Sequence, residues 1–213
     1  MAITGRAGDI RNPVFARVYD RVLSKEGRLM RELRAGLVEG SRGRVLELGP
    51  GNGPNFALYP PAVTEVVAVE PEPYLRERAA EAAGRATVPI RVTGGVAEAL
   101  PLEDDSADGV VCSLVLCSVC EPELAVREIR RVLRPGGELR LLEHVGAENR
   151  AAQAVLHAAE STFWSRAFGN CHPTRHTLAA IEAAGFDVSG VSRRVLRASA
   201  VEPPLPYITG VAR

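Results

Sequence analysis

Strand-like and helix-like segments alternate along most of the chain. Short apolar runs are separated by amphipathic runs that begin at proline or threonine and end at glycine. Parallel strands need a crossover connection, usually a helix, so this alternation predicts a doubly wound α/β fold. The expected strands are 44–48, 65–70, 88–92, 107–115, 138–145, 186–198 and 205–212. The expected helices are 13–27, 28–40, 73–84, 121–137, 148–170 and 174–185, with a short one near Phe56.

The length and charge of the chain limit its number of domains, its partners and its location. The 213 residues are most simply one domain, 1–213, large enough to bury about 70% of the unfolded-chain surface. Lys+Arg and Asp+Glu both number 26, so no net field favours nucleic acid or an anionic membrane. The N-terminus lacks a signal-peptide pattern and no apolar run has the length of a membrane span. A cytoplasmic protein without a membrane anchor is expected.

Four cysteines raise the question of a metal or cluster. Cys112, Cys117 and Cys120 have the C-x4-C-x2-C spacing of plant-type ferredoxins, and Cys171 follows downstream. Cys112 and Cys117 lie in an apolar, strand-like run, whereas a cluster needs a loop that wraps it. Neither a CxxC pair nor an HExxH helix supports a zinc site. The cysteines are therefore interpreted as small buried residues, and no metal site is expected.

Three glycines follow the first strand of the expected sheet. Gly49, Gly51 and Gly53 alternate with other residues directly after 44–48, and glycine lets backbone N–H groups approach a ligand closely. In open parallel sheets ligands bind beyond the carboxyl ends of the strands. Glu70 ends the next strand, 21 positions after Gly49, where a carboxylate accepts hydrogen bonds from ribose hydroxyls. Together these features predict a nucleoside-containing ligand.

Pro54 helps to choose among such ligands. A dinucleotide fingerprint read from Gly49 needs a small residue where Pro54 stands, and its ring would obstruct helix–strand packing. The lysine of a phosphate-binding P-loop is also missing. S-adenosylmethionine (SAM) fits the remaining pattern, because its sulfonium and amino acid end need no pyrophosphate cradle.

Several motifs, in order and spacing, resemble those of class I SAM-dependent methyltransferases. They are VLELGPGNG, VVAVEPEP, GVAEALPLEDDSADGVVCSLVLCSV, EIRRVLRPGGEL and LLEHV. Within that superfamily SLVLCSV, RVLRPGG, EHV and GNCHPTRHTL look most like the thiol S-methyltransferase branch, known from microsomal alkyl-thiol methyltransferases. The resemblance covers about residues 40–213. The microsomal members carry a hydrophobic anchor ahead of the domain, and none is seen in this sequence.

The resemblance implies a fold and a division of the chain. The fold is a Rossmann-like, seven-stranded sheet, mostly parallel with an antiparallel edge strand, preceded by N-terminal helices. Residues 1–42 would form a helical cap, 43–145 the SAM-binding core, and 146–213 the lid and substrate-side elements.

The resemblance also implies how the cofactor is held. Gly49, Gly51 and Gly53 would line its methionine and ribose, Glu70 would hold the ribose hydroxyls, and Pro71 would pack on adenine. Val96 and Ala97 would meet the adenine edge through their backbone, because Val96 stands where many members have an aspartate. Leu114 would lie on the other side of the cofactor. Tyr19 would cover it. Glu47 would either orient the cofactor through the loop or satisfy loop amides.

The acceptor side is less sharply defined by the sequence. A thiol with a pKa of about 8.5 is only partly ionised at neutral pH, so a base assists its methylation. His144, at the end of strand 138–145, is the expected base, and His172 is a second candidate to face the substrate. Phe163, Trp164 and Phe168 are expected either to pack in the core or to form a lid over a small lipophilic acceptor.

The sequence therefore predicts a SAM-dependent methyltransferase acting on a small molecule, most simply a thiol. Two alternatives stay open. One is an N-, O- or C-methyltransferase for a natural product, quinone or lipid head group. The other is a non-catalytic SAM-binding module.

Overall fold

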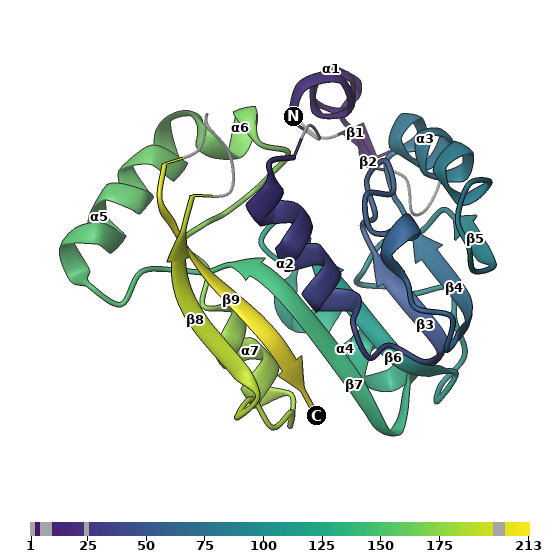
Figure 1. The fold of residues 1–213 in the computed structure, drawn as a ribbon. Coiled ribbons are helices and arrows are strands. Elements are labelled where there is room, and N and C mark those ends of the chain that lie inside the picture. The colour runs from purple at the N-terminus through teal and green to yellow at the C-terminus, as the bar shows by residue number, and fades with distance from the viewer. Residues whose placement is uncertain (1–2, 5–9, 24–25, 198–202) are drawn as a thin grey trace.

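A computed structural model describes residues 3–4, 10–23, 26–197 and 203–213. Within these residues a seven-stranded sheet has the order β5-β4-β3-β6-β7-β9-β8 (Figure 1). Its strands are β3 (Gly43–Leu48), β4 (Val63–Val69), β5 (Ile90–Thr93), β6 (Ala107–Ser113), β7 (Leu133–His144), β8 (Val191–Leu196) and β9 (Leu205–Ala212). The first five are mutually parallel, as predicted.

The antiparallel pairings lie at one edge of the sheet. β9 pairs antiparallel with β7, where His144 is opposite Tyr207, and antiparallel with the edge strand β8. The predicted mixed sheet is thus confirmed, with the reversed strand next to the edge. Because β9 lies beside β7, the segment after residue 146 completes the sheet that residues 43–145 begin.

Helices cover both faces of the sheet. α2 (Arg28–Val38) crosses the face turned to the viewer in Figure 1, while α4 (Pro122–Val132) and α7 (Thr177–Ala183) lie behind it. β3 is buried on both sides: Val45 packs in the same apolar cluster as α2, and Leu46 in the cluster that contains α4 residues. Such two-sided burial explains the continuous apolar runs of the central strands. α3 (Pro73–Ala83) and the short 3-10 helix η2 (Phe56–Leu58) fall where helices are predicted.

Several boundaries differ from the sequence prediction. The expected helix 121–137 ends at Val132, because Leu133 already pairs with Ala107 and begins β7. The expected strand 186–198 is shorter, since β8 starts at Val191, and residue 198 lies outside the described residues. A two-stranded ribbon of β1 (Ile3–Thr4) and β2 (Ile10–Arg11) is not predicted at all. Strands this short carry too few residues for a periodic signal.

Two predicted helices contain a π-helical turn. The helix expected over 13–27 is α1 (Pro13–Val18) followed by the π-helix η1 (Tyr19–Leu23); residues 24–25 lie outside the described residues. The helix expected over 148–170 is α5 (Arg150–Ala159), the π-helix η3 (Glu160–Trp164) and α6 (Ser165–Ala167). α1 and α6 lie at the end of the sheet toward which the parallel strands run (Figure 1). Such π-turns occur frequently at functional sites.

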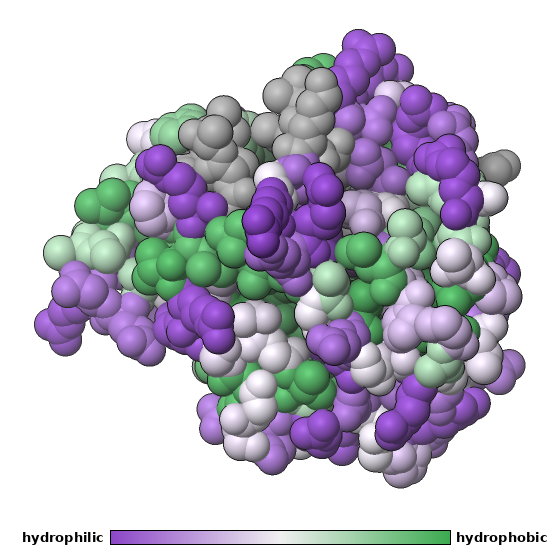
Figure 2. Space-filling model, viewed as in Figure 1, coloured by the Kyte–Doolittle hydropathy of each residue, from purple (hydrophilic) through white to green (hydrophobic). Residues whose placement is uncertain are grey.

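The outer surface of α2 is polar. Hydrophilic side chains lie over this helix at the centre of the view in Figure 2, and Arg28, Arg31 and Glu32 are exposed. Among the described residues, no helix combines the length and the apolar character that crossing a membrane requires.

Candidate active site

A cleft of about 380 Å³ opens at the carboxyl ends of the parallel strands. Its walls come from α1, η1, α2, the segments that follow β3, β4, β5 and β6, the end of β7, and η3 with the segment after α6. Most of the predicted site residues line it, namely Tyr19, Gly49, Gly51, Glu70, Pro71, Val96, Ala97, Leu114 and His144. Three others, Glu47, Gly53 and His172, are not among the residues that line it. The fold thus brings together residues from six separate parts of the chain.

The glycine loop leaves no room for side chains. Gly49 and Gly51 have φ angles of 54° and 61°, in the left-handed region that favours glycine. A Cβ on Gly49 would lie 2.6 Å from Val115 Cγ2, and one on Gly51 would lie 2.9 Å from Tyr19 Cε1. Tyr19 in η1 therefore lies directly against Gly51, and its role in covering the cofactor stays a prediction. Gly53 faces the ring of Phe56 instead.

Glu70 ties the end of β4 to the glycine loop. Its Oε2 accepts a hydrogen bond from Gly51 N at 2.9 Å, and its Oε1 accepts one from Glu72 N at 3.0 Å. The side chain is buried at the wall of the cleft, and burial raises the pKa of Glu70 to about 7. A carboxylate fixed in this way can accept hydrogen bonds from a ligand without first changing its conformation.

Glu47 lies behind the glycine loop. Its Oε1 accepts from Asn55 Nδ2 at 2.8 Å, and its Oε2 accepts from Tyr59 Oη at 2.7 Å. Burial raises the pKa of Glu47 above its usual range. Of the two roles considered for Glu47, these contacts match support of the loop, through side chains that follow it.

Arg34 is a cleft residue that the sequence analysis missed. It is only 4% exposed, and it donates from Nη1 to Ser113 Oγ at 2.7 Å and to Asn55 Oδ1 at 3.2 Å. Its Nε donates to Glu26 Oε1 at 2.6 Å. A signal was available: Arg34 follows Met30 by four residues on the buried stripe of α2, which also contains Leu37.

Leu114 marks the end of β6. It is one of three non-glycine residues with positive φ in the described part of the chain, at 59°, and its N donates to Leu142 O at 2.8 Å. This conformation costs on the order of 1 kcal/mol or more and concentrates at functional sites. The bend turns the chain after Ser113 into the cleft wall, which Val96 and Ala97 also line.

His144 and two cysteines form the deep end of the cleft. Cys171 Sγ lies 3.5 Å and Cys117 Sγ 3.8 Å from His144 Nδ1, and the two sulfurs are 3.6 Å apart. All three side chains are buried and all three line the cleft. The His144 ring also meets Tyr207 edge-on, with ring centroids 4.5 Å apart.

The cysteine prediction holds for three residues and fails for one. Cys112, Cys117 and Cys171 are buried, and Cys120 is exposed. Cys120 lies just past the apolar run, in the turn before α4, where its backbone N donates to the Glu98 carboxylate.

The aromatic group divides between the cleft and the surface. Trp164 and Phe168 line the cleft, with ring centroids 4.4 Å apart, whereas Phe163 is 54% exposed. The π-helical turn η3 carries Trp164 toward the interior while Phe163 points outward. Two of the three aromatic residues therefore form an apolar part of the wall of the cleft that His144 also lines.

His172 belongs to a polar cluster beside the cleft. Its Nδ1 lies 2.8 Å from Glu160 Oε1, and its Nε2 lies 3.3 Å from Asn170 Oδ1. The Glu160 carboxylate also accepts from the Thr174 hydroxyl at 2.5 Å. These contacts tie the start of η3 to the segment that carries Cys171.

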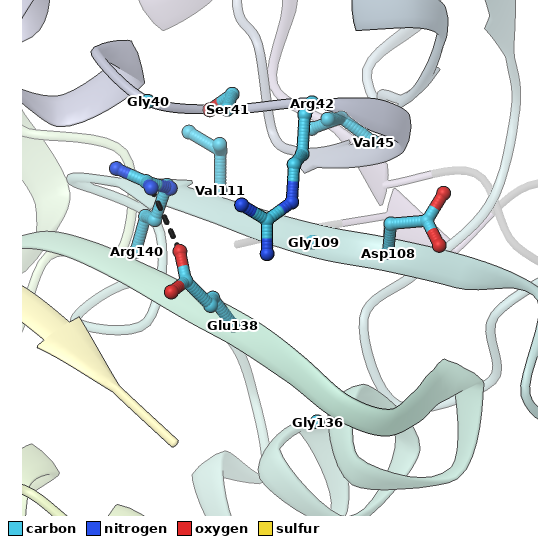
Figure 3. Close-up of a pocket in the computed structure, with 10 residues that line it drawn as sticks. All are labelled: Gly40, Ser41, Arg42, Val45, Asp108, Gly109, Val111, Gly136, Glu138 and Arg140. Carbon is cyan, nitrogen blue, oxygen red and sulfur yellow. Dashed lines mark hydrogen bonds and ion pairs between the residues drawn. The ribbon is translucent and has the colours of Figure 1, made fainter.

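A second, much smaller pocket lies at the opposite end of the strands (Figure 3). Its volume of about 20 Å³ suits a single water molecule. Arg140, which lines it, donates to Glu138 Oε2 at 2.7 Å and to the carbonyls that end α2. The arginine has a structural role there, joining α2 to β7.

Comparisons with known proteins agree with this geometry. Residues 46–141 match the family model of a methyltransferase domain. The chain is 38% identical over 178 residues to thiol S-methyltransferase TMT1B of Rattus norvegicus, covering 80% of this chain and 71% of that protein. It is 36% identical over 182 residues to TMT1A of Homo sapiens, covering 81% and 72%.

A solved structure shows the same fold at lower sequence identity. The crystal structure of the [4+2]-cyclase SpnF superposes with a TM-score of 0.68 at 20% identity, covering 87% of this chain and 79% of that one. That similarity concerns the fold alone, because one fold can carry different chemistries.

The matched domain and the level of identity over most of the chain together settle the family. The cofactor is SAM. The chain is an enzyme of the class I SAM-dependent methyltransferases and belongs, within them, to the family that includes the thiol S-methyltransferases TMT1A and TMT1B.

Proposed function

We propose that the enzyme methylates the sulfur of a small lipophilic thiol. The observation that carries this proposal is the likeness to thiol S-methyltransferases, which extends beyond the matched methyltransferase domain. The cleft supports it, since Trp164 and Phe168 give an apolar surface to the same cleft that His144 lines. A small apolar acceptor fits such a wall better than a charged one.

We assign cofactor binding to the residues on the glycine-loop side of the cleft. Glu70 accepts from the ribose hydroxyls, and the backbone of Gly49 and Gly51 approaches the amino acid end of the cofactor. Pro71, Val96, Ala97 and Leu114 enclose the adenosine part, and Tyr19 closes over the loop. Glu47 and Gly53 act indirectly, by supporting the loop from behind.

Alignment of the acceptor with the methyl group of SAM matters more for this reaction than a strong acid or base does. Bound SAM supplies a methyl group on a positively charged sulfur, ready for in-line displacement. The protein holds an acceptor against that methyl group, and alignment of this kind supplies up to about 7–11 kcal/mol of the barrier reduction.

His144→Ala should lower kcat for a thiol substrate by roughly 10²-fold, because His144 activates the acceptor sulfur. His157→Ala is the matched control. His157 is exposed on α5 and is not among the residues that line the cleft, so its variant should keep wild-type turnover. Steady-state kinetics of both variants tests this. An unchanged kcat in His144→Ala would remove His144 from the reaction.

A competition assay tests the choice of acceptor. Purified enzyme with SAM is offered a mixture of alkyl thiols, amines and phenols, and methylated products are identified by mass spectrometry. The proposal predicts methyl thioethers as the dominant products. Methylated amines or phenols without any thioether would instead support the N- or O-methyltransferase alternative.

We propose a positioning role for His172. Its contacts with Glu160 and Asn170 hold the segment next to Cys171 against η3. It acts on the site through that segment rather than by touching the substrate.

A further inference from the structure

We propose that Cys117, His144 and Cys171 bind a zinc ion at the acceptor end of the cleft. The protein would supply three ligands, and the fourth position would take the sulfur of the acceptor. The metal site stands on geometry alone, whereas the identity of the fourth ligand rests on the proposed thiol methylation. This departs from the absence of a metal site expected from the sequence.

The distances among the three ligand atoms match those of tetrahedral zinc. With Zn–S at about 2.3 Å and Zn–N at about 2.0–2.1 Å, tetrahedral angles set S···S near ~3.8 Å and S···N near ~3.5 Å. The structure has 3.6 Å between the two sulfurs, and 3.5 Å and 3.8 Å from them to His144 Nδ1. The three ligand atoms are therefore already spaced like three corners of the tetrahedron of ligands around a zinc ion.

The chain holds the two cysteine segments in place through the backbone. Glu143 accepts from Leu116 N at 3.0 Å and from Cys117 N at 3.4 Å, and so fixes the turn after β6. His172 N donates to Cys117 O at 2.8 Å, which joins this turn to the Cys171 segment. Glu143 and His144 are neighbours in β7, so one strand end organises all three ligands.

A second bond joins the same two segments. Asn170 Nδ2 donates to Ser118 O at 2.8 Å, and Asn170 has a φ of 67° that turns the chain just before Cys171. This strained turn, like the bend at Leu114, lies in the wall of the cleft. Ligand positions fixed by such supporting contacts are typical of metal sites.

The donor set selects the metal and its role. Two thiolates and one imidazole suit zinc, and three protein ligands with an open fourth position are typical of catalytic rather than structural zinc. Because all three residues line the cleft, the open position faces the space where the acceptor binds. Trp164 and Phe168 border the same space, so an alkyl group attached to that sulfur would have an apolar surface beside it.

The ion would activate the thiol directly. An acceptor thiol binds zinc as a thiolate and releases its proton to solvent, since a coordinating thiol is deprotonated. The thiolate forms a bond to the methyl carbon while the carbon–sulfur bond of the sulfonium breaks, and that electron pair stays on the cofactor sulfur. The neutral thioether is a weaker ligand than a thiolate, so water or a new thiol replaces it. In this scheme His144 serves as a metal ligand and need not act as a base.

Cobalt(II) substitution tests the metal site without any turnover. The full-length enzyme, freed of metal and kept reduced, is titrated with Co²⁺ and followed by absorption. We expect one ion per chain, with thiolate-to-cobalt charge-transfer bands and intense tetrahedral d–d bands, and displacement of the cobalt by Zn²⁺. Cys117→Ser and Cys171→Ser should each lose stoichiometric binding.

The other two cysteines are matched controls. Cys112→Ala, in the core strand β6, and Cys120→Ala, at the surface, should bind the metal as the wild type does. X-ray absorption of the zinc-loaded wild type counts two sulfur ligands even if a cysteine variant fails to fold. Weak, non-stoichiometric binding, or binding that survives loss of both Cys117 and Cys171, would overturn the site.

Two further measurements separate the metal site from the proposed function. Adding an alkyl thiol with S-adenosylhomocysteine should shift the cobalt bands, and unshifted bands would overturn the open position. His144→Ala should lose the ion and lose turnover at every pH. Loss of turnover mainly at low pH, with the ion retained, would show a base instead. If the bands shift yet only amines or phenols are methylated, the thiol function fails while the metal site stands.

Discussion

Replacing Arg34 by alanine should lower the free energy of unfolding by about 3–5 kcal/mol, the range for breaking a buried ion pair by removing one partner. The Arg34 guanidinium is buried and donates to Glu26, Asn55 and Ser113. Its removal would leave Glu26, whose side chain is only 15% exposed, without its counter-charge. Urea denaturation followed by circular dichroism measures the change.

Arg28→Ala is the control for this prediction. Arg28 lies in the same helix and also pairs with a glutamate, Glu32, but its side chain is 91% exposed. Water screens that pair, so its loss should change the free energy of unfolding little. Equal effects of the two variants would contradict the structural role assigned to Arg34.

Replacing Glu70 by alanine should weaken SAM binding by about 1–3 kcal/mol, through loss of charge-assisted hydrogen bonds to the ribose. Isothermal calorimetry measures the affinity. Glu70→Gln keeps one acceptor and the shape of the side chain, and it should bind more tightly than Glu70→Ala. An affinity unchanged in both variants would remove Glu70 from the cofactor site.

The pKa of Glu70 adds a pH dependence to the same measurement. Burial raises this pKa to about 7, so the free protein holds a proton there in mild acid. A protonated carboxyl cannot accept from both ribose hydroxyls, so the affinity for SAM should fall as the pH drops below 7, by at most about tenfold per pH unit. Glu70→Gln should remove this dependence.

The raised pKa of Glu70 also makes the stability of the free protein depend on pH, and the direction of that dependence follows from the raised value. Because the folded pKa of about 7 exceeds the ordinary value of 4.5, the folded state binds more protons between these two values. The contribution of Glu70 is fully present below pH 4.5 and is lost as the pH rises through 7. A steeper loss of stability over this window in Glu70→Gln than in the wild type would contradict the shift.

Local patterns were sufficient to predict the core of the fold and many of the residues that line the cleft. The glycines after β3 and the acid after β4 are close to strand ends, and parallel strands place those ends together. The order and spacing of the motifs were sufficient to predict the methyltransferase family. The π-helical turns were not predictable, because a helical pattern does not reveal an extra residue in one turn.

The acceptor side depends on contacts between distant segments. Cys117, His144 and Cys171 come from three elements, and no pair of them has a spacing typical of a metal motif. The helical pattern of α2 places Arg34 on the buried face, but it does not reveal its partners Glu26, Asn55 and Ser113. Side chains of this kind acquire their role from tertiary packing, which no short window of sequence contains.

A crystal structure with S-adenosylhomocysteine and an alkyl thiol tests the central claim most directly. The account predicts the ribose against Glu70 and the homocysteine end along Gly49 and Gly51. It also predicts the acceptor sulfur beside His144, between Cys117 and Cys171. A ribose away from Glu70, or an acceptor bound outside this cleft, would contradict it.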